Sequence, residues 1–109
     1  MPQPRRKRPK TLERFEAHFP AAWRQYVHLR DACDRSGPLD AKTRELIKIA
    51  IEVARNRHGG LIAHIDRAKS AGATDREIAH TLVLALPLVG LPDVLDALVA
   101  ARKRLAVPR

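Results

Sequence analysis

The stretch AKTRELIKIAIEVARN, residues 41–56, has the clearest helical pattern in the chain. Apolar residues recur in it at the spacing i, i+4, i+7 and i+8, which places them on one helix face: Leu46, Ala50, Val53 and Ala54. Ile47, Ile49 and Ile51 widen the apolar surface, so we expect this helix to be buried on more than one side. Asp40 directly precedes the stretch and is a good N-cap.

Helical patterns with start and stop signals continue on both sides of this segment. We expect further helices over residues 11–19, 20–33, 61–72, 75–90 and 93–106. Thr74 and Glu77 form a capping-box pattern, in which each side chain bonds to the backbone amide of the other residue. Pro87 lies inside an apolar run and should kink or end its helix. The fold is therefore predicted to be all-α, with about six helices and no strand.

The composition fits a helical domain of ordinary size. The chain has 109 residues, of which 45% are hydrophobic and only 4% aromatic, so Leu, Ile, Val and Ala must build the core. A β-sandwich would favour β-branched and aromatic residues. A domain this small leaves much of its surface uncovered, and a second copy could bury its apolar faces. We therefore expect a homo-oligomer.

The net charge of +9 is unevenly distributed. Residues 1–10 contain five basic residues, three prolines and no acid, which predicts a disordered basic tail ahead of a folded domain over residues 11–109. Such a tail either makes weak, nonspecific contact with nucleic acid or only keeps the protein soluble. Nucleic-acid binding predicts a steep salt dependence and a loss of binding when residues 1–10 are removed.

Cysteine usage and hydropathy exclude several protein classes. The single cysteine, Cys33, rules out a disulfide within one chain and any Cys-x-x-Cys chemistry, and we expect it to be a small buried apolar residue. Trp23 and Tyr26 are expected to anchor packing. No run of 18 apolar residues and no signal-peptide pattern is found, so we expect a cytoplasmic protein without a membrane span.

The segment RNRHGGLIAH, residues 55–64, contains the candidate functional residues. His64 could act as a general acid or base near neutral pH, or could be a core histidine satisfied by a hydrogen bond. Asn56, Arg57 and His58 precede a Gly-Gly pair, where an arginine, a histidine and helix-start amides could hold a carboxylate. The alternative is a flexible helix connection. The histidines lack metal-ligand spacing such as HExxH, so no metal site is expected.

Three stretches together resemble the carboxymuconolactone decarboxylase family, within the superfamily of alkylhydroperoxidase D-like proteins. They are GPLDAKTRELIKIAI, ARNRHGGLIAHIDRAKSAGATDREI and LALPLVGLPDVLDAL. The resemblance covers roughly residues 36–103. It implies an all-α subunit that assembles into a homotrimer or homohexamer, with the active cleft near the subunit contacts.

The resemblance also assigns roles to individual positions. The peroxidase branch of the superfamily has a Cys-x-x-Cys pair before a relay histidine and a relay glutamate one helix earlier. Here His64 and Glu45 match the relay residues, whereas Arg57 and Gly60 stand at the two cysteine positions. Because disulfide chemistry needs both thiols, we expect no peroxidase activity of that kind. Asn56 and Arg57 are similar to the Asn-Arg run often found in the decarboxylase branch.

The expected activity is that of a lyase-type enzyme acting on a small carboxylated lactone or a related acid, without a cofactor. His64 would move a proton, Glu45 would tune or relay it, and Arg57 would hold a substrate carboxylate with Asn56 and His58 nearby. The alternative is a non-catalytic binding or assembly protein that retains the fold. The missing Cys-x-x-Cys pair motivates this alternative, and the sequence leaves open whether turnover exists.

Overall fold

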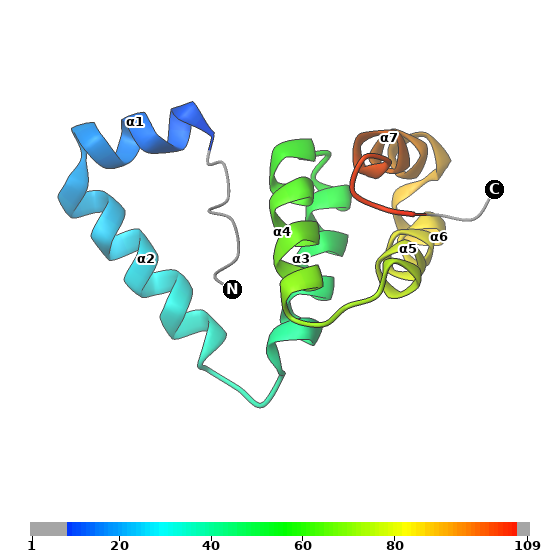
Figure 1. The fold of residues 1–109 in the computed structure, drawn as a ribbon, viewed down its shortest axis with the longest axis horizontal. Helices are drawn as coiled ribbons and strands as arrows, with labels where there is room; N and C mark the ends of the chain where they lie inside the picture. The colour runs from blue at the N-terminus through cyan, green and yellow to red at the C-terminus, as the bar shows by residue number, and fades with distance from the viewer. Residues whose placement is uncertain (1–8, 107–109) are drawn as a thin grey trace. The chain divides into compact units, whose positions relative to one another are not determined.

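The structure is a computed structural model that describes residues 9–106. Most of the predicted basic tail lies outside the described residues, and Lys10 is already the first residue of a helix. The described part is all-helical, with seven helices and no strand (Figure 1). The chain divides into two compact units, one ending at Pro38 and the other beginning at Leu39.

The first unit consists of α1 (Lys10–His18) and α2 (Pro20–Asp34). Pro20 starts α2, where its missing amide hydrogen costs nothing. Neither helix contains a buried residue, and four aromatic rings lie beside one another: Phe15, Phe19, Trp23 and Tyr26. Trp23 and Tyr26 therefore contact each other, with 5.7 Å between ring centroids, but Tyr26 remains exposed.

The structure contradicts the expectation that Cys33 is buried. Its side chain is exposed near the end of α2, whereas a buried apolar role was expected. The physical reason is that no residue of α1 or α2 is buried, so this unit has no core for Cys33 to join. The single thiol is free.

The second unit contains five helices. They are α3 (Ala41–Ala54), α4 (His58–Ser70), α5 (Asp75–Leu84), α6 (Leu86–Val89) and α7 (Leu91–Ala101). Figure 1 shows α3 and α4 lying side by side, with α5, α6 and α7 next to them. The predicted N-cap of α3 is confirmed, because Asp40 Oδ1 accepts a hydrogen bond from the Thr43 amide at 2.8 Å.

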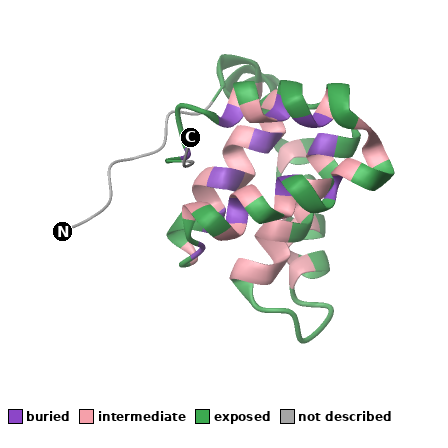
Figure 2. Cartoon of the chain, turned by 90° about the vertical axis from the view of Figure 1, so that its right-hand side faces the viewer, coloured by how far each residue is buried: buried purple, intermediate pink, exposed green. Residues whose placement is uncertain are grey.

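The core of this unit is aliphatic, as the composition predicts. It is built where the apolar faces of α3, α4, α5 and α7 meet, and burial follows one stripe on each helix (Figure 2). Its largest fully buried side chains are Ile49, Val53, Leu61, Ile65, Ile78 and Leu82. On α3, however, Ile47 and Ile51 are exposed. Within the second unit, α3 is buried on one side only, and its residues Ile47 and Ile51 lie outside the core.

The predicted helix over residues 75–90 is two helices. Pro87 lies in the first turn of the short α6, so the chain begins a new helix near Ala85 where the proline would break a continuous one. This accounts for seven helices where about six were expected. Gly90, with φ of 106°, then redirects the chain into α7 through a conformation that favours glycine.

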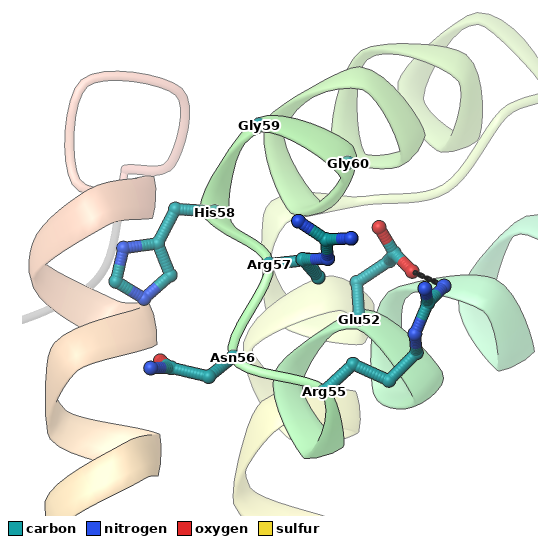
Figure 3. Close-up of a pocket in the computed structure, with 7 residues that line it drawn as sticks. All are labelled: Glu52, Arg55, Asn56, Arg57, His58, Gly59 and Gly60. Carbon is teal, nitrogen blue, oxygen red and sulfur yellow. Dashed lines mark hydrogen bonds and ion pairs between the residues drawn. The ribbon is translucent and has the colours of Figure 1, made fainter.

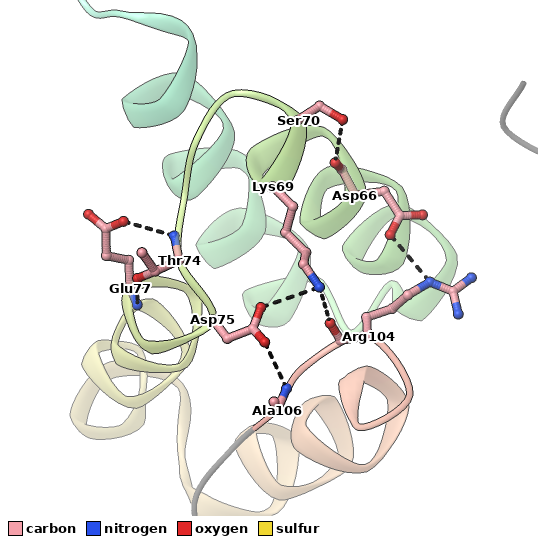
Figure 4. A network of polar contacts seen from close by, with 8 residues as sticks. All are labelled: Asp66, Lys69, Ser70, Thr74, Asp75, Glu77, Arg104 and Ala106. Carbon is pink, nitrogen blue, oxygen red and sulfur yellow. Dashed lines mark hydrogen bonds and ion pairs between the residues drawn. The ribbon is translucent and has the colours of Figure 1, made fainter. Parts of the chain in front are cut away.

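Polar contacts hold the end of the described chain against α4 and α5 (Figure 4). Lys69 Nζ donates to the carbonyl of Arg104 at 2.7 Å and pairs with Asp75 at 3.3 Å. Asp75 also accepts a hydrogen bond from the Ala106 amide at 2.9 Å. The segment after α7 is thereby tied to the start of α5. No helix of the described residues is long and apolar enough to cross a membrane.

Candidate functional site

Glu45 and His64 form a close pair between α3 and α4. Glu45 lies in the second turn of α3 and His64 in the middle of α4, and the two helices are packed together. His64 Nδ1 lies 2.7 Å from Glu45 Oε2, and the side chains are 18% and 14% exposed, respectively. Because a carboxylate only accepts hydrogen bonds, Nδ1 is the protonated nitrogen, and Nε2 is turned away from Glu45.

Several charges act on the Glu45 carboxyl. Burial raises the pKa of Glu45, but the hydrogen bond from His64 and the positive charges of His64, Lys48 and Arg67 lower it by more. The net result is a pKa below the ordinary 4.5. Glu45 is therefore an anion at neutral pH and holds the His64 ring in place through the hydrogen bond to Nδ1.

A pocket lies at the α3–α4 connection. It encloses about 470 Å³ and is lined by Glu52, Arg55, Asn56, Arg57, His58, Gly59 and Gly60 (Figure 3). The three residues predicted to bind substrate all belong to this lining. Glu45 and His64 do not line it; His64 follows Gly60 by one helical turn along α4.

The three predicted binding residues do not all extend in the same direction. In Figure 3 the side chains of Asn56 and His58 lie on one side of the connection, and Arg57 lies on the other side with Glu52. Asn56 has a positive φ of 56°, a conformation that asparagine tolerates. His58 Nε2 is buried and has no hydrogen-bond partner in the described residues, which is rare for a buried polar atom.

Glu52 is a pocket residue that the sequence interpretation did not single out. Its side chain is 13% exposed, and Oε1 accepts a hydrogen bond from the 59% exposed Arg55 at 3.1 Å. The available signal was its spacing: Glu52 follows Glu45 by seven residues, which places both carboxylates on one face of α3. The apolar residues of α3 give a stronger helical pattern than its two acidic residues, Glu45 and Glu52.

Positions 57 and 60 contain no thiol, and Cys33 belongs to the other compact unit. At position 60 a Cβ atom would overlap the Glu52 carboxylate where it lies in this structure, so a side chain there would require the Glu52 side chain to move. Among residues 9–106, no cluster of three or more His, Cys, Asp or Glu side chains could hold a metal ion. The lining of the pocket contributes one carboxylate, one imidazole and two guanidinium groups.

The sequence matches the carboxymuconolactone decarboxylase family over residues 20–103, which includes the helix pair that carries Glu45 and His64. A search of curated protein sequences found no match.

Proposed function

This chain belongs to the carboxymuconolactone decarboxylase family, and on that premise we propose that it decarboxylates a small carboxylated lactone or a related acid by proton transfer from His64. The observation that carries the proposal is the contact of 2.7 Å between Glu45 and His64 in a mostly buried setting. An imidazole held by a carboxylate is a suitable general acid near neutral pH.

The proposed step needs one proton and no redox partner. The bond between the substrate carbon and its carboxylate breaks, carbon dioxide leaves, and the electron pair stays on the carbon as an enolate-like anion. His64, protonated on both nitrogens, gives the proton at Nε2 to that carbon. Glu45 stabilises the imidazolium before the transfer and keeps the proton on Nδ1 afterwards. Solvent then returns a proton to Nε2.

Arg57 is proposed to hold a substrate carboxylate that is not lost in the reaction. Arg57 lines the pocket and precedes His64 by seven residues, which is about two helical turns. A guanidinium paired with the departing carboxylate would stabilise the reactant more than the transition state, which would slow the reaction. Asn56 and His58 complete the polar wall of the pocket.

The test is carbon dioxide release from a panel of small carboxylated lactones and related acids. His64→Ala should lower turnover by about 100-fold or more, the usual contribution of a general acid, while the melting temperature and helical circular dichroism change little. His80→Ala, which removes an exposed histidine on α5, is the matched control and should retain turnover.

Two results would overturn this proposal. Turnover that persists in His64→Ala would show that the proton comes from elsewhere. A wild-type protein that releases no carbon dioxide from any acid of the panel would instead favour the alternative function, a non-catalytic binding or assembly protein.

We also propose that the working form is a homo-oligomer. Large apolar side chains of the second unit remain exposed, including Ile47 and Ile51 on α3 and Leu88 on α6. Exposed apolar surface of this extent is typical of a protein-interaction face. A symmetric assembly of identical chains would bury it.

A further inference from the structure

Glu52 lines the pocket, and its carboxylate lies against Gly60 of α4. Two turns of α3 separate it from Glu45, and it contacts neither member of the Glu45–His64 pair in the described structure. One oxygen, Oε1, is held by Arg55. The other, Oε2, lies against Gly60 and has no hydrogen-bond donor among the described residues. An ionised oxygen in this position can accept a hydrogen bond from a ligand.

The position of Glu52 depends on the absence of a side chain at residue 60. A Cβ atom built on Gly60 would meet the Oε2, Cδ and Cγ atoms of Glu52. A Cβ atom on the neighbouring Gly59 would meet nothing within 4 Å. The two glycines of the pair therefore differ: the second one is what allows the Glu52 carboxylate to lie against α4.

The charged residues that line the pocket determine which ligands it can bind selectively. Arg55 and Arg57 present guanidinium groups that favour a carboxylate, but the mostly buried Glu52 would repel a second anionic group beside it. A ligand that carries a hydroxyl or ammonium group next to its carboxylate satisfies both demands. Its anionic end pairs with a guanidinium, and its hydrogen-bond donor meets Glu52 Oε2.

We propose that Glu52 is a specificity-determining residue, which selects small carboxylic acids that also carry a hydrogen-bond donor over the same acids without one. This inference rests on the proposed function, since it names the substrate class of that site. A site built to pair with a polar ligand group discriminates strongly against the analogue that lacks the group, because its own polar atom is then left unpaired.

The test is calorimetric binding of three acids of nearly equal size to the full-length protein: glutarate, 2-hydroxyglutarate and glutamate. We expect at least one of the two donor-bearing acids to bind about tenfold or more tightly than glutarate. Comparing the affinities of 2-hydroxyglutarate and glutamate shows whether a hydroxyl or an ammonium group is the preferred donor. In Glu52→Gln, which keeps the shape and removes the charge, the preference should fall to about threefold or less, because a neutral amide oxygen is the weaker acceptor.

Substitutions of the two glycines provide a second, independent test. Gly60→Ala should push the Glu52 carboxylate out of its place and reduce the preference as Glu52→Gln does, whereas Gly59→Ala, the same change one residue earlier, should retain it. If Gly60→Ala fails to fold, Glu52→Gln still decides the matter.

Each outcome bears on one proposal separately. Equal affinity of the wild type for all three acids, or a preference that survives in Glu52→Gln, would overturn the role of Glu52 and leave the proton transfer by His64 in place. Binding of none of the three acids would also overturn it. Loss of turnover in Glu52→Gln together with unchanged relative affinities would be a further contradiction, because it would indicate a role in the reaction without one in selection.

Discussion

At the scale of single residues, the chemistry of this protein depends on which acids of α3 contact α4. Glu45 reaches a histidine that is 19 residues later in the chain, and Glu52 reaches a glycine. The first contact orients an imidazole, and the second places a carboxylate in the lining of a pocket. Two acids on one helix face thus have different partners and different proposed roles.

The lowered pKa of Glu45 predicts how stability changes with pH. A carboxyl whose pKa is lower in the folded state stabilises the fold fully above its unfolded pKa, and this contribution is lost as the pH falls through the folded value. The difference in unfolding free energy between the wild type and Glu45→Gln should therefore shrink as the pH falls below 4.5, the ordinary value for this group. Urea unfolding at a series of pH values measures it. A difference that stays constant down to pH ~3 would contradict the assigned coupling.

The pairing of Glu45 with His64 could be anticipated from the family resemblance, but the position of Glu52 could not. Resemblance transfers roles only onto positions that match a known motif, and Glu52 matches none. Its spacing of seven residues from Glu45 indicates a shared face of α3, but its contact requires knowing that the Glu52 carboxylate lies against Gly60 of α4. The sequence contains both residues but not the distance between them.

At the scale of helices, the residues that begin a helix are easier to predict from the sequence than the connections between helices. The capping box at α5 is present as predicted: the Thr74 hydroxyl accepts from the Glu77 amide at 3.1 Å, and the Thr74 amide donates to Glu77 Oε1 at 2.9 Å. Local spacing alone determines such a motif. The sequence predicted that Pro87 would kink or end its helix. In the structure the helix ends before Pro87, and Pro87 lies in the separate short helix α6.

Removing the cap at Thr74 should destabilise the protein measurably. Thr74→Ala deletes the oxygen that satisfies the Glu77 amide, so the free energy of unfolding should fall by about 1 kcal/mol. Thr74→Ser keeps the hydroxyl and is the matched control, with an expected loss well below that of alanine. Chemical denaturation of both variants measures the effect. Equal losses for alanine and serine would mean that the hydroxyl is not what stabilises this end of α5.

At the scale of the whole molecule, the prediction of burial was incomplete because several large apolar residues of the second unit lie outside its core. The α3 face that contains Ile49 and Val53 is buried, but Ile47 and Ile51 are exposed. Helical periodicity identifies apolar residues without saying whether the same chain or another copy covers them. The expectation that α3 is buried on more than one side stays a prediction, which the proposed assembly would satisfy.

Self-association predicts a specific response to charge on the exposed apolar surface. Leu88 on α6 is 89% exposed, so Leu88→Glu should cost the isolated chain little stability but should oppose burial against another copy. We expect the wild type to sediment as an oligomer and Leu88→Glu to shift toward the monomer. Arg76→Glu, an exposed site on α5, is the control and should sediment as the wild type does. A monomeric wild type at micromolar concentration would refute the assembly proposal.

The contact of Glu52 with Gly60 also constrains how this protein could have changed during evolution. A lineage that gains a cysteine, or any other side chain, at position 60 must also move the Glu52 carboxylate away from α4, by another side-chain conformation or by a substitution. A change at position 60 therefore also alters the charge that lines the pocket, even when residue 52 itself is unchanged.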